Sequence, residues 1–153
     1  NLLKNDFIID IKYHPNDFSN SFSKLKNSKY INIYENKFDI IKLIQECYVM
    51  ITDVSESSIL SIILGKPVLF YFNNSYNFNL FNDIYHFNDH EKKLFCTQNC
   101  NDLLNILIKI KNNKKYYNQI KKIQEIYVKS YITNQDFRCI TSTGKIDKIL
   151  NNV

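Results

Sequence analysis

The stretch Val49–Phe72, VMITDVSESSILSIILGKPVLFYF, decides the fold of this chain. A short apolar run ends at Thr52, a serine cluster opens a helical segment over residues 57–64, and Gly65 closes that segment before a second apolar run. This order of strand, loop, helix and strand is typical of a parallel α/β sheet. Helix N-termini favour anions, and ligands of open α/β sheets bind outside the carboxyl ends of the strands. The stretch therefore predicts a site for a phosphate-bearing molecule.

The rest of the chain extends this pattern in both directions. We expect further strands at 7–13, 30–34 and 94–97, and helices at 40–47 (capped by Asp39), 101–111, 114–131 and 143–150. Between the strand at 67–72 and the strand at 94–97 lies a long, aromatic, Asn-rich loop over 73–89. Strands that alternate with helices predict a Rossmann-like three-layer α/β/α domain with a parallel sheet.

Size and composition set the class of protein. With 153 residues, of which 44% are hydrophobic and 23% charged, the chain fits one globular domain over 1–153. No apolar run approaches the length of a membrane span, no signal peptide is recognisable, and the four cysteines form no CxxC pair. These features favour a cytoplasmic protein with free thiols. The start at NLLKNDFIID, without an initiator Met, favours a fragment of a longer protein.

The formal net charge of +5 is concentrated in the lysine-rich segment 109–129. A solvated helix face is the commonest explanation of such a segment, and contact with an anionic membrane surface is the second. Nucleic acid is the least favoured partner, because Arg138 is the only arginine and no nucleic-acid motif is present.

The segment from Thr52 to Ser58 holds the candidate phosphate-binding residues. Helix N–H groups and hydroxyls can bind phosphate oxygens there, and the candidates are Thr52, Asp53, Ser55, Ser57 and Ser58. The alternative is plain helix capping by Asp53 or Ser55, with Glu56 or Ser58 completing a capping box. Asp53 has a further structural explanation, as a carboxylate that only fixes the loop.

Two other groups of residues are candidates. His14, followed by Pro15, ends the first predicted strand, where a histidine can donate to a phosphate or act as an acid or base. The rings of the loop 73–89, Tyr76 among them, either cover the cleft or pack onto the sheet. We expect no metal site and no cofactor, since a cluster of His86, His90, Cys96 and Cys100 matches no common metal-ligand spacing.

Together, His14-Pro15, the TDxS at 52–55 and the GKPVLFY at 65–71 resemble the C-terminal half of the CDP-glycerol glycerophosphotransferases. These enzymes of teichoic-acid and capsule-polysaccharide synthesis have the GT-B architecture of two Rossmann-like domains. The resemblance spans about 14–76 and, more loosely, TSTGKIDKIL at 141–150. The family's second serine falls on Glu56 here, and an acidic residue common later in its helix falls on Leu60.

The resemblance implies roles for several residues. His14 aligns with the histidine near the donor phosphates or the reacting hydroxyl, and 52–55 align with the donor-phosphate loop. His86 and His90 are candidates for the family's second histidine. The partners that it implies are a nucleotide-diphosphate donor and an N-terminal acceptor-binding domain of the same protein. Separately, the lysine- and tyrosine-rich segment 114–131 would suit an enzyme that touches the anionic inner face of a membrane.

We therefore expect the donor-binding half of a GT-B glycosyl- or glycerophosphotransferase, inactive as an isolated fragment. Two other functions stay open. One is a non-catalytic Rossmann-like binding or regulatory module, favoured by Glu56 and Leu60. The other is a nucleotide-sugar epimerase of the same architecture.

Overall fold

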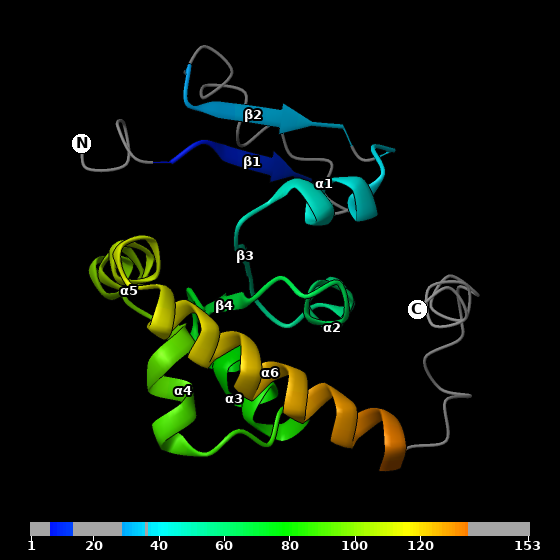
Figure 1. Ribbon diagram of the computed structural model, residues 1–153, viewed down its shortest axis with the longest axis vertical. Helices are drawn as coiled ribbons and strands as arrows, with labels where there is room; N and C mark the ends of the chain where they lie inside the picture. The colour runs from blue at the N-terminus through cyan, green and yellow to red at the C-terminus, as the bar shows by residue number, and fades with distance from the viewer. Residues whose placement is uncertain (1–6, 14–28, 36, 135–153) are drawn as a thin grey trace. The chain divides into compact units, whose positions relative to one another are not determined.

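The computed structural model describes residues 7–13, 29–35 and 37–134, with only the backbone of 131–134 (Figure 1). Its contacts divide the chain into two compact units, residues 1–46 and 47–153. Each unit is described by itself, and a single domain over 1–153 stays a prediction. The described residues form five strands and six helices. His14, the tail 141–150 and the helix predicted at 143–150 lie outside the described residues.

Unit 1 contains two parallel strands and one helix. Strand β1 (Ile9–Lys12) pairs with β2 (Ile31–Tyr34) in the register Ile9↔Ile31 to Lys12↔Tyr34. Helix α1 (Ile40–Glu46) begins after Asp39, whose carboxylate accepts a hydrogen bond from the Ile41 N–H at 2.9 Å. Both predicted strands and the Asp39 cap are confirmed.

Unit 2 is built on a three-stranded parallel sheet. Its strands, β3 (Met50–Thr52), β4 (Val68–Tyr71) and β5 (Cys96–Thr97), lie in the order β3-β4-β5. Residues 68–70 of β4 are all fully buried, so both faces of this strand are covered, because neighbouring side chains point to opposite faces. The predicted α/β class with a parallel sheet is confirmed.

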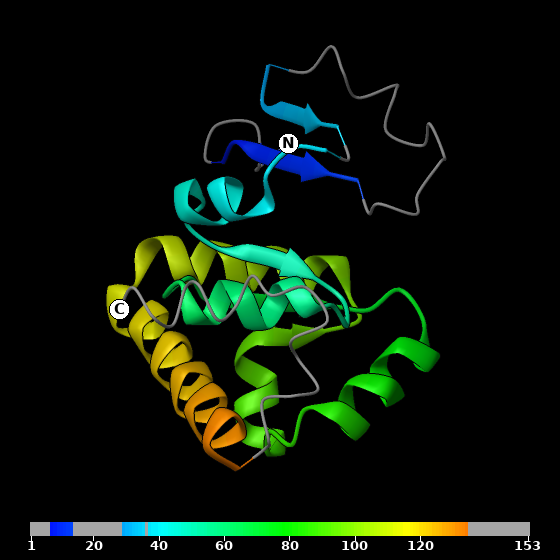
Figure 2. The same cartoon turned by 90° about the vertical axis from the view of Figure 1, so that its right-hand side faces the viewer.

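Strand β3 differs from the prediction in its burial. The apolar run at 49–52 predicts a strand buried on both faces, but Ile51 is 46% exposed. The reason is position: within unit 2, β3 pairs only with β4 and forms one side of the sheet. Figure 2 shows β3 as the outermost arrow of this unit.

Helix α2 (Glu56–Ile63) joins β3 to β4 and ends as the sequence predicts. Gly65 adopts φ +72°, a left-handed conformation that L side chains rarely adopt. The N–H of Gly65 bonds the carbonyl of Ile62, and the N–H of Lys66 bonds that of Ser61, both at 2.9 Å. These two bonds are a Schellman motif, which satisfies the last carbonyls of the helix and turns the chain into β4.

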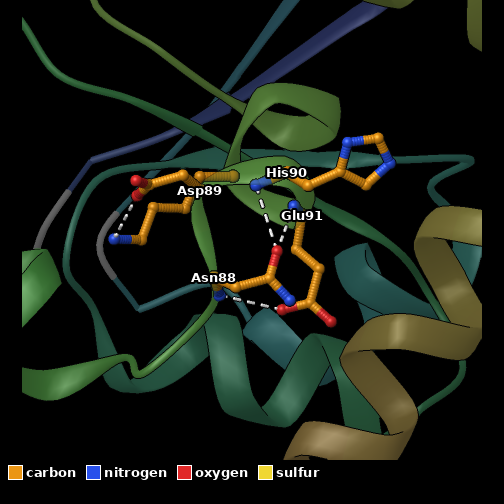
Figure 3. Close-up of polar contacts among 5 residues, drawn as sticks. Asn88, Asp89, His90 and Glu91 are labelled. Atoms are coloured by element: carbon orange, nitrogen blue, oxygen red, sulfur yellow. Dashed lines mark hydrogen bonds and ion pairs between the residues drawn. The ribbon is translucent and has the colours of Figure 1, made fainter.

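The expected loop over 73–89 is wrong, because most of it is helical. Helix α3 (Ser75–Ile84) is capped by Asn74, whose side chain accepts from the Asn77 N–H at 2.8 Å. Helix α4 (Asp89–Phe95) follows and takes the start of the strand expected at 94–97. Its N-terminus is a capping box in which Asn88 and Glu91 each accept a hydrogen bond from the other's backbone N–H (Figure 3).

The aromatic residues of this region form the core. Phe70 lies at 4.7 Å from Phe81 and 5.2 Å from Tyr85 between ring centroids. The rings at the heart of this aromatic cluster are all buried: Phe70, Phe72, Phe81, Tyr85, Phe87 and Phe95. These rings therefore pack onto the sheet and do not cover a cleft.

Helices α5 (Cys100–Asn112) and α6 (Lys114–Asn134) complete unit 2. In Figure 1, α6 runs diagonally across the unit (yellow to orange), and it packs against α2, α4 and α5. The helices predicted at 101–111 and 114–131 are both confirmed, and Ile126 of α6 is 57% exposed. Among the described residues, no helix is apolar enough over a sufficient length to cross a membrane.

The buried face of α6 includes one polar side chain. Gln124 is fully buried, accepts a hydrogen bond from the Val68 N–H at 2.9 Å and donates one to the Val68 carbonyl at 2.7 Å. Strand β5 pairs with β4 only at Phe70 and Tyr71. The side chain of Gln124 therefore satisfies backbone groups of β4 that this short strand does not reach.

Candidate functional site

The loop after β3 places the predicted serines at the start of α2. Ser55 is the N-cap, with an extended backbone, and its hydroxyl accepts from the Ser57 N–H at 3.3 Å. The hydroxyls of Ser55 and Ser57 also bond each other at 2.7 Å, and both residues are half-buried. The capping role of Ser55 is confirmed. Hydroxyls that are only half-buried can also reach a ligand.

Ser58 has a different position from the other serines. Its side chain is fully buried, and its hydroxyl bonds the Ser55 carbonyl and the Tyr85 hydroxyl, each at 2.6 Å. With two short bonds and no exposed surface, this hydroxyl holds the first turn of α2 to the aromatic cluster. Its position gives it a structural role.

Asp53 is exposed and links the loop to α3. Its carboxylate accepts a hydrogen bond from the side-chain amide of Asn77 at 3.0 Å. Thr52, the last residue of β3, is half-buried. Asp53 thus has the geometry of a residue that fixes the loop, and it does so through a side-chain amide.

The carboxyl ends of the three strands share one edge of the sheet, and each is followed by a capped helix. Ser55 caps α2 after β3, Asn74 caps α3 after β4, and Asn99 caps α5 after β5. In Figure 2 the head of β3 points to the right-hand side of unit 2, where α3 also lies. The first N–H groups of a helix lack intrahelical acceptors and carry the positive end of its dipole. We call this edge, residues 52–57, 72–77 and 97–102, the capped edge.

The charged side chains of the capped edge are all acidic. Asp53, Glu56 and Asp102 lie on it, and its three segments contain no lysine or arginine. Any attraction for an anion must therefore come from helix N–H groups and hydroxyls. Because Glu56 is in the first turn of α2, it stabilises that helix but repels a phosphate at the same N-terminus.

A tyrosine and a cysteine meet at the same edge. The Tyr71 hydroxyl and the Cys100 sulfur lie 3.0 Å apart, and Cys100 is the first residue of α5. The hydrogen bond to Cys100, with partial desolvation, raises the pKa of Tyr71. Like any tyrosine hydroxyl near neutral pH, that of Tyr71 is protonated and can act as a hydrogen-bond donor.

The other candidates fall in different places. Tyr76 is 73% exposed in the first turn of α3 and belongs to the capped edge. His86 is exposed and follows Tyr85, the C-cap of α3, whereas His90 is exposed in the first turn of α4 (Figure 3). The structure thus brings Thr52, Asp53, Ser55, Ser57 and Tyr76 to one edge, and leaves His86 outside it.

The described residues of this edge form no metal cluster. Within 7–13, 29–35 and 37–134 there is no group of three or more His, Cys, Asp or Glu side chains that could hold a metal ion. A surface depression in unit 1 is lined by the four residues of β2, none of which is a predicted site residue.

Sequence reasoning missed the caps of α3 and α5 and the partner of Asp53. Asn74 and Asn99 are ordinary N-terminal signals, since asparagine is a preferred cap. Asn74 could have been predicted as a cap, but the many other asparagines of the chain made it hard to recognise. The pairing of Asp53 with Asn77 joins residues 24 positions apart, and no local pattern indicates it.

Comparisons of the chain with protein-family models, with curated proteins and with solved structures found no match.

Proposed function

We propose that the capped edge binds the nucleotide diphosphate of an activated donor, and that the chain is the donor-binding half of a GT-B glycosyl- or glycerophosphotransferase of surface-polysaccharide synthesis. One observation carries the proposal: three parallel strands end at the same edge, and each is followed by a capped helix N-terminus. Ligand binding at such an edge is the general behaviour of open α/β sheets. The resemblance of 14–76 to the glycerophosphotransferases supplies the reaction class.

The chemistry follows from where charge develops. In either transfer, the bond between the transferred group and the nucleotide phosphate breaks, and a bond to the acceptor hydroxyl oxygen forms while that hydroxyl gives its proton to a base of the acceptor-binding half. The departing nucleotide gains negative charge, and N–H groups of the α2 first turn stabilise it. The hydroxyls of Ser55 and Ser57 add donors at the same point. His14, by its resemblance, would take part in proton transfer or offset this charge.

Binding by this edge alone should be weak. Helix N–H groups and hydroxyls supply attraction, but no lysine of the capped edge adds to it, and Glu56 opposes it. An effect of a helix N-terminus on a nearby anion is on the order of 0.3–1 kcal/mol at exposed positions. We therefore expect a dissociation constant for CDP or UDP in the millimolar range.

Glu56 and Asp53 support a second function, a non-catalytic binding module. A carboxylate at the first helical position is a common stabilising device and needs no ligand. With Asp53 engaged by Asn77 and Ser58 buried, the loop is also complete as a purely structural turn. A module of this kind would keep its fold and bind no nucleotide.

Isothermal titration of the 153-residue chain with CDP and with cytidine separates the two functions. We expect a measurable heat for CDP and none for cytidine, because the helix N–H groups bind phosphate oxygens. Ser55→Ala should weaken CDP binding severalfold, while Ser130→Ala, an exposed serine of α6, serves as the control and should not. Absence of CDP binding by the folded wild-type chain would contradict the proposal and favour the module.

A further inference from the structure

The local device that fixes the loop Asp53–Ser55 is the Ser55 cap at its end, whose hydroxyl bonds the N–H and the hydroxyl of Ser57. The loop contains neither glycine nor proline, and no non-glycine residue described has a positive φ. Each such backbone residue loses conformational entropy on ordering, at a cost of about 1–2 kcal/mol. The Ser55 cap acts only at the end of the loop, so contacts at Asp53 and at the Ser55 carbonyl add to the fixing of its shape.

Helix α3 and its C-cap provide the outside contacts on both sides of the loop. Asn77, in the first turn of α3, donates to the Asp53 carboxylate at 3.0 Å. Tyr85, the C-cap of α3, bonds the Ser58 hydroxyl at 2.6 Å, and Ser58 in turn donates to the Ser55 carbonyl at 2.6 Å. One helix thus contacts the start and the end of the turn that presents the predicted phosphate site.

Tyr85 is itself rigidly placed. It is 3% exposed, its ring stacks on Phe81 at 4.9 Å between centroids, and its backbone N–H bonds the Phe81 carbonyl at 2.7 Å. Its ring also lies 5.2 Å from that of Phe70 in the central strand. The hydroxyl of Tyr85 is therefore a fixed point of the core that reaches the first turn of α2.

We infer that Tyr85 is a positioning residue, which acts through Ser58 to keep the N-terminus of α2 in its ligand-binding shape before a ligand arrives, with Asn77 as the second anchor. The effect on binding rests on the proposed function, whereas the effect on the loop does not. A site held in its bound conformation avoids the ordering cost on binding. Neither residue touches the ligand in this scheme.

Tyr85→Phe removes only the hydroxyl and keeps the ring in the aromatic cluster. Tyr116→Phe is the matched control, since Tyr116 is also buried and donates its hydroxyl to the Leu94 carbonyl at 2.7 Å, but not to the α2 turn. Hydrogen exchange of the backbone amides of Ser57 and Ser58, followed by NMR without ligand, reports the loop. The amide of Ile120 in α6 reports the rest of the fold.

In Tyr85→Phe, we expect the Ser57 and Ser58 amides to exchange about fivefold to tenfold faster relative to Ile120, as a lost hydrogen bond allows. In Tyr116→Phe, this ratio should stay at its wild-type value. Ser58→Ala, which removes the other hydroxyl of the pair, should accelerate the same exchange. If Tyr85→Phe does not fold, Ser58→Ala tests whether the hydrogen bond between these two residues holds the loop. Equal ratios in the Tyr85 and Tyr116 variants would overturn the inference.

The same variants, titrated with CDP, test the consequence for binding. Weaker binding in Tyr85→Phe, with wild-type binding in Tyr116→Phe, is the expected result. Wild-type affinity in a Tyr85→Phe chain whose loop exchanges faster would overturn the positioning role. If the wild-type chain binds no CDP, the proposed function fails, and the exchange ratios still decide whether Tyr85 holds the loop.

Discussion

The capped edge and helix α6 differ in the charge that they carry. Residues 109–129 contain seven lysines, whereas the three segments of the capped edge contain none and carry three carboxylates. All the lysines of α6 are exposed or half-buried. Its buried face contacts the sheet through Gln124. The positive net charge of the chain therefore does not indicate where a phosphate would bind.

The two regions use their backbone hydrogen-bonding groups differently. At the capped edge, helix N–H groups face outward and are partly satisfied by Ser55, Asn74 and Asn99, which suits an anion. On α6, one buried side chain satisfies the N–H and carbonyl of Val68, which suits a core. Changes in the two regions should consequently alter different properties: binding at the edge, and stability at α6.

The largest effect should come from Gln124→Leu. The substitution keeps the size of the side chain and leaves the buried Val68 N–H and carbonyl without this partner. Each of these two unsatisfied groups costs about 1–3 kcal/mol, so we expect the free energy of unfolding to fall by about 2–6 kcal/mol in urea denaturation.

Gln119→Leu, at an exposed position of the same helix, is the control and should change that free energy by less than about 0.5 kcal/mol. A Gln124→Leu chain as stable as the wild type would show that the hydrogen bonds to Val68 make no net contribution to stability. It would contradict the stabilising role of α6.

Glu56→Gln should have a smaller effect. It should lower the stability of the chain but strengthen the binding of CDP. Loss of the carboxylate from the first turn of α2 should lower the free energy of unfolding by about 0.3–1 kcal/mol, since that charge complements the helix dipole. The same loss removes repulsion and should strengthen CDP binding about twofold to fivefold. Thermal unfolding and calorimetric titration of one sample measure both.

Asp102→Asn removes a carboxylate from the first turn of α5 and is the matched variant. Comparing its CDP affinity with that of Glu56→Gln shows whether the change in affinity is specific to the N-terminus of α2. Weaker CDP binding in Glu56→Gln would mean that the carboxylate contacts the ligand favourably, and would contradict the expected repulsion.

Local patterns predicted the parts of the fold that local chemistry determines. The strand, the serine cap and the glycine stop of 49–72 each follow from neighbouring residues, and the structure confirms them with the Ser55 cap and the Gly65 turn. Helices α3 and α4 were missed because the many asparagines of 73–89 resemble a loop, although Asn74 and Asn88 act as caps there.

The candidate site was predictable only in part, for a physical reason. The positions of Ser55 and Ser57 follow from the start of α2, so the local sequence is enough to predict them. The burial of Ser58 depends on Tyr85, 27 residues away, and the engagement of Asp53 depends on Asn77. Contacts of this range arise from packing, which no periodicity in a single sequence encodes.

We expect a phosphate to bind the capped edge, not the lysine-rich helix α6. Titration of the ¹⁵N-labelled chain with CDP, followed by amide chemical shifts, tests it directly. We predict that the amide signals of Glu56 and Ser57, with those of Ser75 and Tyr76, move in a saturable way while those of 114–130 stay in place. Saturable shifts confined to 114–130 would contradict this expectation.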